Sequence, residues 1–201
     1  MPEALGAVLD ALAQPFVDPA SRTWWVGLVS ALALYALLGE RGWARRLLAD
    51  LRSPSSSLDV QLMLSGQLLG LFIGGSSVAG AWLLATRAVR WLDGVVGAPP
   101  TPALSPLAAS ALYTAALFVA WDASRWLVHW LLHRVPALWA FHQVHHSAAV
   151  LTPLTFHRVH PVEGLLYQLR SVLVTGSVTA IFYWLFRGAA VDATLLGVSA
   201  V

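Results

Sequence analysis

The hydrophobic residues of this chain fall into long uncharged runs that short polar or basic stretches separate. The first run, Trp24 to Leu38, opens with a Trp pair and predicts a first transmembrane helix that borrows flanking residues to reach span length. Further spans are expected over 60–84, from 107 to 121 as the start of a third, and over 165–186. The pattern therefore predicts an all-α fold, an integral membrane helical bundle with about four transmembrane helices.

The segments between these runs predict where the helices end and where the chain divides into regions. Residues 1–22 have the spacing of a short amphipathic helix and carry no basic region of the kind that precedes a signal peptide's apolar core. Ser53 to Ser57 contains a proline among serines and is expected to break a helix, whereas Arg87 to Pro106 is expected to be a loop. We predict two regions, an N-terminal one over 1–57 and a membrane domain over 58–201.

Polar residues inside the spans are interpreted as packing features. The second span is interrupted by small and polar side chains that favour close helix contacts over a ligand site. They are Gln61, Ser65, Gln67, Gly74 and Gly75. Arg170, near the start of the fourth span, is expected to snorkel towards the membrane surface. The run from Thr194 to Val201 resembles the start of another apolar segment.

Charge predicts an orientation and excludes one class of partner. The densest basic stretch holds Arg41, Arg45, Arg46 and Arg52, and the positive-inside rule places it in the cytoplasm. All twelve basic residues are arginines and they are scattered, so nucleic-acid binding is not expected. Absence of lysine together with abundant alanine and arginine favours a bacterial cell membrane as the location.

Composition agrees with a membrane protein. The 201 residues are 58% hydrophobic and 11% charged, and the mean hydropathy is +0.68, whereas soluble domains are about 45–50% apolar and about 25% charged. There is no cysteine, so a metal can only be held by histidine and carboxylate side chains.

All seven histidines lie between His129 and His160. His129 and His133 are four residues apart, so a helix would place both on one face. The next group repeats this spacing at i, i+3 and i+4, and consists of His142, His145 and His146. Five convergent imidazoles predict a transition-metal site, because neutral imidazole suits iron, copper, zinc and nickel. We expect the two groups to converge; His157 and His160 are equally open to a structural role.

The motifs around these histidines resemble the fatty acid hydroxylase and sterol desaturase superfamily. The resemblance rests on HxxxH at 129–133, Pro-x-Leu-Trp at 136–139, HxxHH-Ser at 142–147 and Arg-x-His-Pro at 158–161, in that order. It implies a membrane non-haem di-iron enzyme with a cytosol-facing histidine-rich cap. Such an enzyme hydroxylates or desaturates a lipid C–H bond with dioxygen, and an external donor supplies electrons.

The resemblance also implies roles for individual residues. His129 and His133 would be one ligand pair and His142, His145 and His146 the second group, with His157 and His160 as further metal candidates and zinc as a possible substitute for iron. Asp122 would support or close the site from across the helices. Arg158 and Glu163 are expected to pair beneath the metal.

One departure from the superfamily pattern leaves two functions open. The pattern has another HxxHH cluster downstream, and no histidine follows His160 in this sequence. The chain is therefore interpreted as a family member truncated before the last histidine cluster. The leading hypothesis is the oxygen-dependent lipid hydroxylase or desaturase, and the alternative is an inactive relative that binds a metal structurally. A metal transporter is less favoured, because the first two spans contain neither histidines nor acids.

Overall fold

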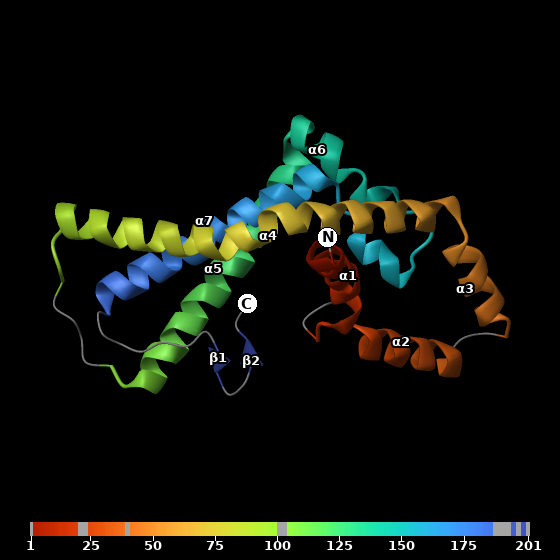
Figure 1. The fold of residues 1–201 in the computed structure, drawn as a ribbon, viewed down its shortest axis with the longest axis horizontal. Helices are drawn as coiled ribbons and strands as arrows, with labels where there is room; N and C mark the ends of the chain where they lie inside the picture. Colours follow the sequence, from red (N-terminus) through yellow and green to blue (C-terminus); the bar gives the residue numbers. More distant parts are fainter. Residues whose placement is uncertain are drawn as a thin grey trace. The chain divides into compact units, whose positions relative to one another are not determined.

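The computed structural model describes residues 2–19, 24–38, 41–99, 104–186, 194–195 and 198–199, and nearly all of them lie in helices. The longer helices are α1 (Pro2–Val17), α2 (Trp25–Leu38), α3 (Trp43–Leu51), α4 (Pro54–Val95), α5 (Pro106–Arg134), α6 (Pro136–His142) and α7 (Pro161–Leu185), shown in Figure 1. Two 3₁₀ turns, η1 (His145–Ser147) and η2 (Pro153–His157), join α6 to α7.

The chain divides into two compact units. The first comprises residues 1–74 and 135–164, and the second comprises residues 75–134 and 165–201. α4 contributes to both, and only the first turn of α7 belongs to the first unit. The predicted amphipathic helix near the N-terminus is confirmed as a helix by α1.

The predicted break at Ser53–Ser57 is confirmed, and it creates the start of α4. Pro54 occupies the first helical position, where a missing N–H costs nothing. Ser53 caps the helix, because its Oγ accepts a hydrogen bond from the Ser56 N–H at 3.2 Å. The Ser56 hydroxyl in turn donates to the Asp50 carbonyl of α3 at 2.7 Å, which ties the end of one helix to the start of the next.

The predicted loop over Arg87–Pro106 is wrong in its first part, because α4 continues to Val95. Between Arg87 and Asp93 the sequence contains no glycine or proline, and its residues are compatible with a helix. The chain leaves the helix at Gly97, whose φ of 83° lies in the left-handed region. Its N–H still bonds to the Asp93 carbonyl at 3.1 Å, as at many helix C-termini.

The core of the second unit lies between α5 and α7. Three residues at i, i+4 and i+8 of α5, Ala109, Tyr113 and Leu117, form a buried stripe against Phe182 of α7. The Tyr113 hydroxyl bonds to the Thr179 hydroxyl at 2.8 Å. Trp121 Nε1 donates to the Thr175 hydroxyl at 3.2 Å. Positions rise along α5 as they fall along α7, so the two helices pack antiparallel.

The snorkelling predicted for Arg170 is wrong. The side chain is only 8% exposed, and its Nη1 donates to the Trp121 carbonyl at 3.1 Å and to the Ser124 hydroxyl at 2.9 Å. Its guanidinium also stacks over the Trp121 ring, 4.2 Å from the centroid. These contacts with α5 hold the guanidinium inside the unit, although its Nε has no hydrogen-bond partner among the described residues.

Two of the predicted spans have the length and apolar character needed to cross a membrane. They are α5 and α7, with 29 and 25 residues; α2 is apolar but has only 14 residues. The total of four spans and the histidine-rich cap on the cytosolic side stay predictions. The apolar segment expected after Thr194 begins instead as two-residue strands, β1 (Thr194–Leu195) paired antiparallel with β2 (Val198–Ser199).

Candidate metal centre

The second histidine group does not lie on one helix as predicted. α6 ends at His142, and His145 begins the 3₁₀ turn η1. Only Gln143 and Val144 separate the end of α6 from η1, so the three rings still lie together. The ring centroids of His142, His145 and His146 lie 4.9–5.5 Å from one another. We call these three residues the histidine triad.

His142 is held by a buried carboxylate. Its Nδ1 lies 3.0 Å from Glu163 Oε1, and the two side chains are 1% and 4% exposed. A carboxylate only accepts hydrogen bonds, so Nδ1 donates the proton and Nε2 keeps its lone pair. A carboxylate behind a histidine in this way is the arrangement that orients metal-binding imidazoles and raises their basicity.

His145 is oriented by the backbone. Its Nδ1 lies 3.2 Å from the carbonyl oxygen of Arg158. A carbonyl also only accepts, so Nδ1 of His145 carries the proton and Nε2 is available as a ligand. The ring itself is exposed. His142 and His145 therefore have the same tautomer, imposed by two different acceptors.

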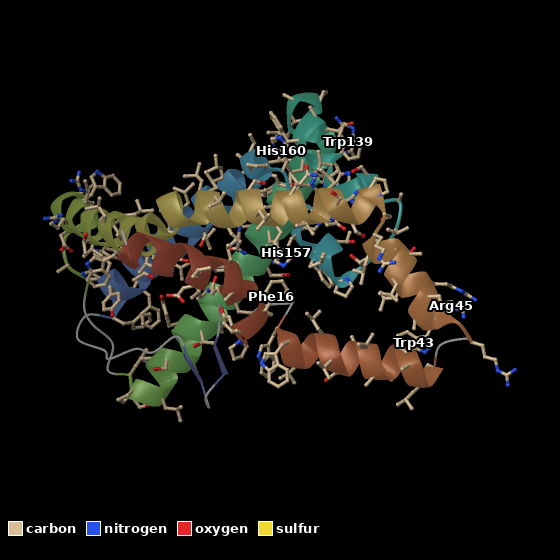
Figure 2. The ribbon with its side chains drawn as sticks, turned by 45° about the vertical axis from the view of Figure 1, so that its right-hand side comes forward. Phe16, Trp43, Arg45, Trp139, His157 and His160 are labelled. Atoms are coloured by element: carbon tan, nitrogen blue, oxygen red, sulfur yellow. The ribbon has the colours of Figure 1, made fainter. Side chains whose placement is uncertain are left out.

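The third member, His146, approaches His142 through the nitrogen that metals prefer. The two Nε2 atoms are 3.2 Å apart. Two nitrogens on one metal with bonds of about 2.1 Å are separated by roughly 3.0–3.4 Å in octahedral or tetrahedral geometry. The side of His146 is covered by Trp139 of α6, whose ring centroid lies 5.6 Å away; Trp139 is labelled in Figure 2.

Arg158 does not pair with Glu163 as predicted. Glu163 is engaged by His142, and the Arg158 Nε donates instead to Asp59 Oδ1 of α4. Both partners are buried, with side-chain exposures of 1% and 0%. Sequence reasoning missed Asp59. The signal available was an acidic residue directly before the apolar run that starts at Val60, because a carboxylate at such a position requires a partner once it is buried.

The remaining polar groups of Arg158 bind the same helix and the same loop. Its Nη2 donates to the carbonyl and the hydroxyl of Ser55, and its Nη1 donates to the Ser147 hydroxyl at 3.3 Å. The Thr155 hydroxyl donates to Asp59 Oδ2 at 3.0 Å. The loop that carries the triad is therefore fastened to the first turns of α4.

His129 and His133 lie on the last turns of α5, in the second unit. Their ring centroids are 4.8 Å apart, so the two imidazoles share one face of the helix as their spacing predicts. Both are exposed, and so is Asp122, two turns earlier on α5. The assignment of these three residues to a metal site stays a prediction.

His160 and His157 have contacts of their own, and Figure 2 labels both. His160 precedes α7 and accepts a hydrogen bond from the Val162 N–H on Nδ1 at 3.1 Å, so it caps the helix. Its ring packs against Phe141, with centroids 4.9 Å apart. His157 ends η2 and is half-buried. Burial lowers the pKa of His157, and the Asp59 carboxylate partly opposes this shift.

The chemistry of the first unit fits a transition metal. His142 and His145 each have an unprotonated Nε2. The distance between the Nε2 atoms of His146 and His142 is that expected of two ligands on one metal. In addition, Glu163 Oε2 is buried and has no hydrogen-bond partner among the described residues. A buried carboxylate oxygen without a donor favours a nearby cation or an ordered water. Nitrogen donors with a carboxylate behind them suit iron or zinc.

One comparison with known families finds a match within this chain. Residues 114–197 match the fatty acid hydroxylase family model. The resemblance to the fatty acid hydroxylase and sterol desaturase superfamily is thereby confirmed for this segment. The match begins within α5 and includes every histidine of the chain. Searches of curated proteins and of solved structures found no match.

The fatty acid hydroxylase match relates the geometry of the histidine triad to a class of enzymes. Fatty acid hydroxylases are in general oxidative, iron-dependent enzymes, and this segment contains the histidine triad together with its orienting carboxylate. The match and the two helices of span length indicate a membrane protein.

Proposed function

We propose that this chain is an oxygen-dependent lipid hydroxylase or desaturase with a non-haem di-iron centre. The single observation that carries the proposal is the Glu163–His142–His146 arrangement within a fatty acid hydroxylase segment: the carboxylate fixes one imidazole, and the second lies at ligand spacing from it. Iron bound there would supply the oxygen-activating chemistry that no amino-acid side chain provides.

The proposed ligands come from both histidine groups. The family match contains His129 and His133 of α5 together with the triad, so these two imidazoles are included in the proposed set. His145 and His146 complete the proposed set, while His157, a carboxylate such as Asp122 or water would fill further positions. His160 is a weaker candidate, because its Nδ1 already accepts the Val162 N–H and the proton of the neutral ring then resides on Nε2.

The proposed substrate is a lipid that reaches the site from the membrane. Many large apolar side chains of α5 and α7 are exposed, among them Phe118, Trp126 and Leu169. In a bilayer, such surfaces face acyl chains, so a lipid C–H bond is available without transfer through water. An external protein donor would supply the electrons for each turnover.

We further propose that the basic segment and the triad lie on the cytoplasmic side. The support is the positive-inside rule applied to the arginines of 41–52, of which Arg45 on α3 is labelled in Figure 2. Reporter fusions after Arg52 and after Ser147 should both be active in the cytoplasm. Fusions that report opposite sides of the membrane would contradict this topology.

The enzymatic proposal is tested with the iron-loaded full chain in lipid nanodiscs. The protein is supplied with dioxygen, a ferredoxin-type donor and a panel of acyl and sterol lipids, and mass spectrometry looks for a product that has gained one oxygen atom or lost two hydrogens. His142→Ala should abolish product, whereas Gln143→Ala, an exposed neighbour, should not. Iron binding without product on any lipid would favour the alternative, a relative that binds metal structurally.

A further inference from the structure

Asp59 and Ser55 share one face of α4, because they are four residues apart. Both bind Arg158: Asp59 accepts from Nε, and Ser55 accepts from Nη2 through its carbonyl and its hydroxyl. Asp59 is 0% exposed and Arg158 is 1% exposed. We call this set of contacts the α4 clamp.

The α4 clamp is connected to the triad through the backbone of Arg158. The side chain of Arg158 is fixed on α4, and its carbonyl oxygen lies 3.2 Å from Nδ1 of His145. A second contact, from the Ala149 N–H to the Ser55 hydroxyl at 3.2 Å, holds the chain just after η1 to the same helix. Both ends of the loop that follows the triad are therefore anchored to α4.

We infer that Asp59 is a positioning residue for His145: through Arg158 it fixes the carbonyl that sets the tautomer and direction of this imidazole. The inference rests on the proposed function, because it assigns His145 a metal. Its physical basis is that a metal-binding histidine almost always donates its other ring N–H to a fixed acceptor, and that loss of this acceptor weakens metal binding. For His142 that acceptor is the Glu163 side chain; for His145 it is a carbonyl whose position depends on a residue about a hundred positions away.

The alternative is that the α4 clamp only stabilises the fold. A buried ion pair alone does not distinguish the two, because removing one partner of such a pair destabilises many proteins. The two interpretations differ in their effect on the ring of His145. Positioning predicts a change in tautomer and in metal spectrum at temperatures where the variant is still folded, and stabilisation alone predicts neither.

The first test is made on the metal-free full chain in detergent, labelled with ¹⁵N-histidine. Nitrogen chemical shifts distinguish a ring protonated on Nδ1 from one protonated on Nε2, and the His145→Gln variant assigns the signal. The wild-type chain should show His145 protonated on Nδ1. Asp59→Asn should show a mixture of both tautomers, because the uncharged amide cannot accept from both Arg158 and Thr155. A wild-type ring protonated on Nε2 would overturn the inference.

The second test titrates the same variants with Co²⁺ and records the visible ligand-field spectrum. Asp59→Asn should bind Co²⁺ about 10–100-fold more weakly, with a shifted spectrum, and Asp59→Glu should restore part of the affinity because it restores the charge. The matched control is Asp10→Asn, an exposed carboxylate of α1, which should behave as wild type. Ser55→Ala is a milder variant for the case that Asp59→Asn does not fold, and it should shift the spectrum in the same direction.

The outcomes separate the two proposals. A folded wild-type chain that binds no Co²⁺ would overturn the proposed function. A wild-type chain that binds Co²⁺ with an affinity and spectrum that Asp59→Asn and Ser55→Ala leave unchanged would overturn the α4 clamp as a positioning device, and it would leave the proposed function standing.

Discussion

Glu163 holds His142 through a buried contact of 3.0 Å between Oε1 and Nδ1, across 21 positions of sequence. Glu163→Gln preserves the size and one acceptor oxygen but removes the charge that makes the imidazole more basic. We expect the variant to bind Fe²⁺ or Co²⁺ about 10–100-fold more weakly than wild type in equilibrium dialysis. Asp10→Asn should show no change. Equal affinities for Glu163→Gln and wild type would show that the Glu163 charge does not strengthen metal binding.

Gly176 is expected to be a packing position that tolerates no side chain. A Cβ there would lie 2.8 Å from Leu84 Cδ2 and 2.9 Å from the Ala81 carbonyl oxygen, which is part of a helix backbone and cannot move freely. Gly176→Ala should therefore destabilise the protein by about 1–3 kcal/mol, the usual cost of overpacking. The control is Gly94→Ala, because nothing lies within 4 Å of a Cβ there. Because alanine favours a helix more than glycine does, Gly94→Ala should be as stable as wild type or up to about 1 kcal/mol more stable. Thermal unfolding of both variants in detergent is the measurement, and equal midpoints would contradict this packing.

The hydrogen bond between Tyr113 and Thr179 should stabilise the core of the second unit. Tyr113→Phe keeps the ring against Phe182, 5.2 Å between centroids, but leaves the Thr179 hydroxyl without this partner. The expected loss is about 1 kcal/mol. Tyr183→Phe, on an exposed side chain of α7, serves as the control and should change the unfolding midpoint little. If Tyr183→Phe lost more stability than Tyr113→Phe, burial of the hydroxyl would not explain the loss.

The sequence predicted the helices better than their ends. Spans of apolar residues determined α5 and α7, because length and hydropathy are local properties that a window of sequence contains. The end of α4 was missed because Arg87 to Asp93 is equally compatible with a helix and with a loop, and only the left-handed residue Gly97 ends the helix.

The grouping of the triad histidines was predictable from the sequence, whereas the residues that support them were not. Histidine spacing identified the triad, since residues three and four apart are neighbours on a helix and stay close where α6 passes into η1. The partners of Arg158 and Glu163 depend on which side chains tertiary packing brings together over long sequence separations, and two charged residues five positions apart looked like a local pair. The preference of Arg158 for Asp59 is a property of the packing of α4 against the loop.

Acid should destabilise the metal-free protein through His157. Burial lowers the pKa of His157 below the ordinary value of 6.5, so the unfolded chain binds this proton more readily than the native one. The free energy of unfolding should therefore fall as the pH drops below about 6.5, and the effect should end below the lowered native pKa. Unfolding midpoints at about pH 7.5 and pH 5.5 measure the change. In His157→Gln the decrease should be smaller, and an identical decrease would assign the acid sensitivity to other groups.

X-ray absorption at the iron edge of the loaded full chain tests whether the histidine triad binds iron. Iron bound by the triad should show nitrogen scatterers at about 2.1 Å with the outer-shell pattern of imidazole. This pattern should weaken in His142→Ala and in His146→Ala and stay unchanged in Gln143→Ala. A chain that retains no iron, or iron whose imidazole signal is the same in all these proteins, would show that the triad does not bind iron.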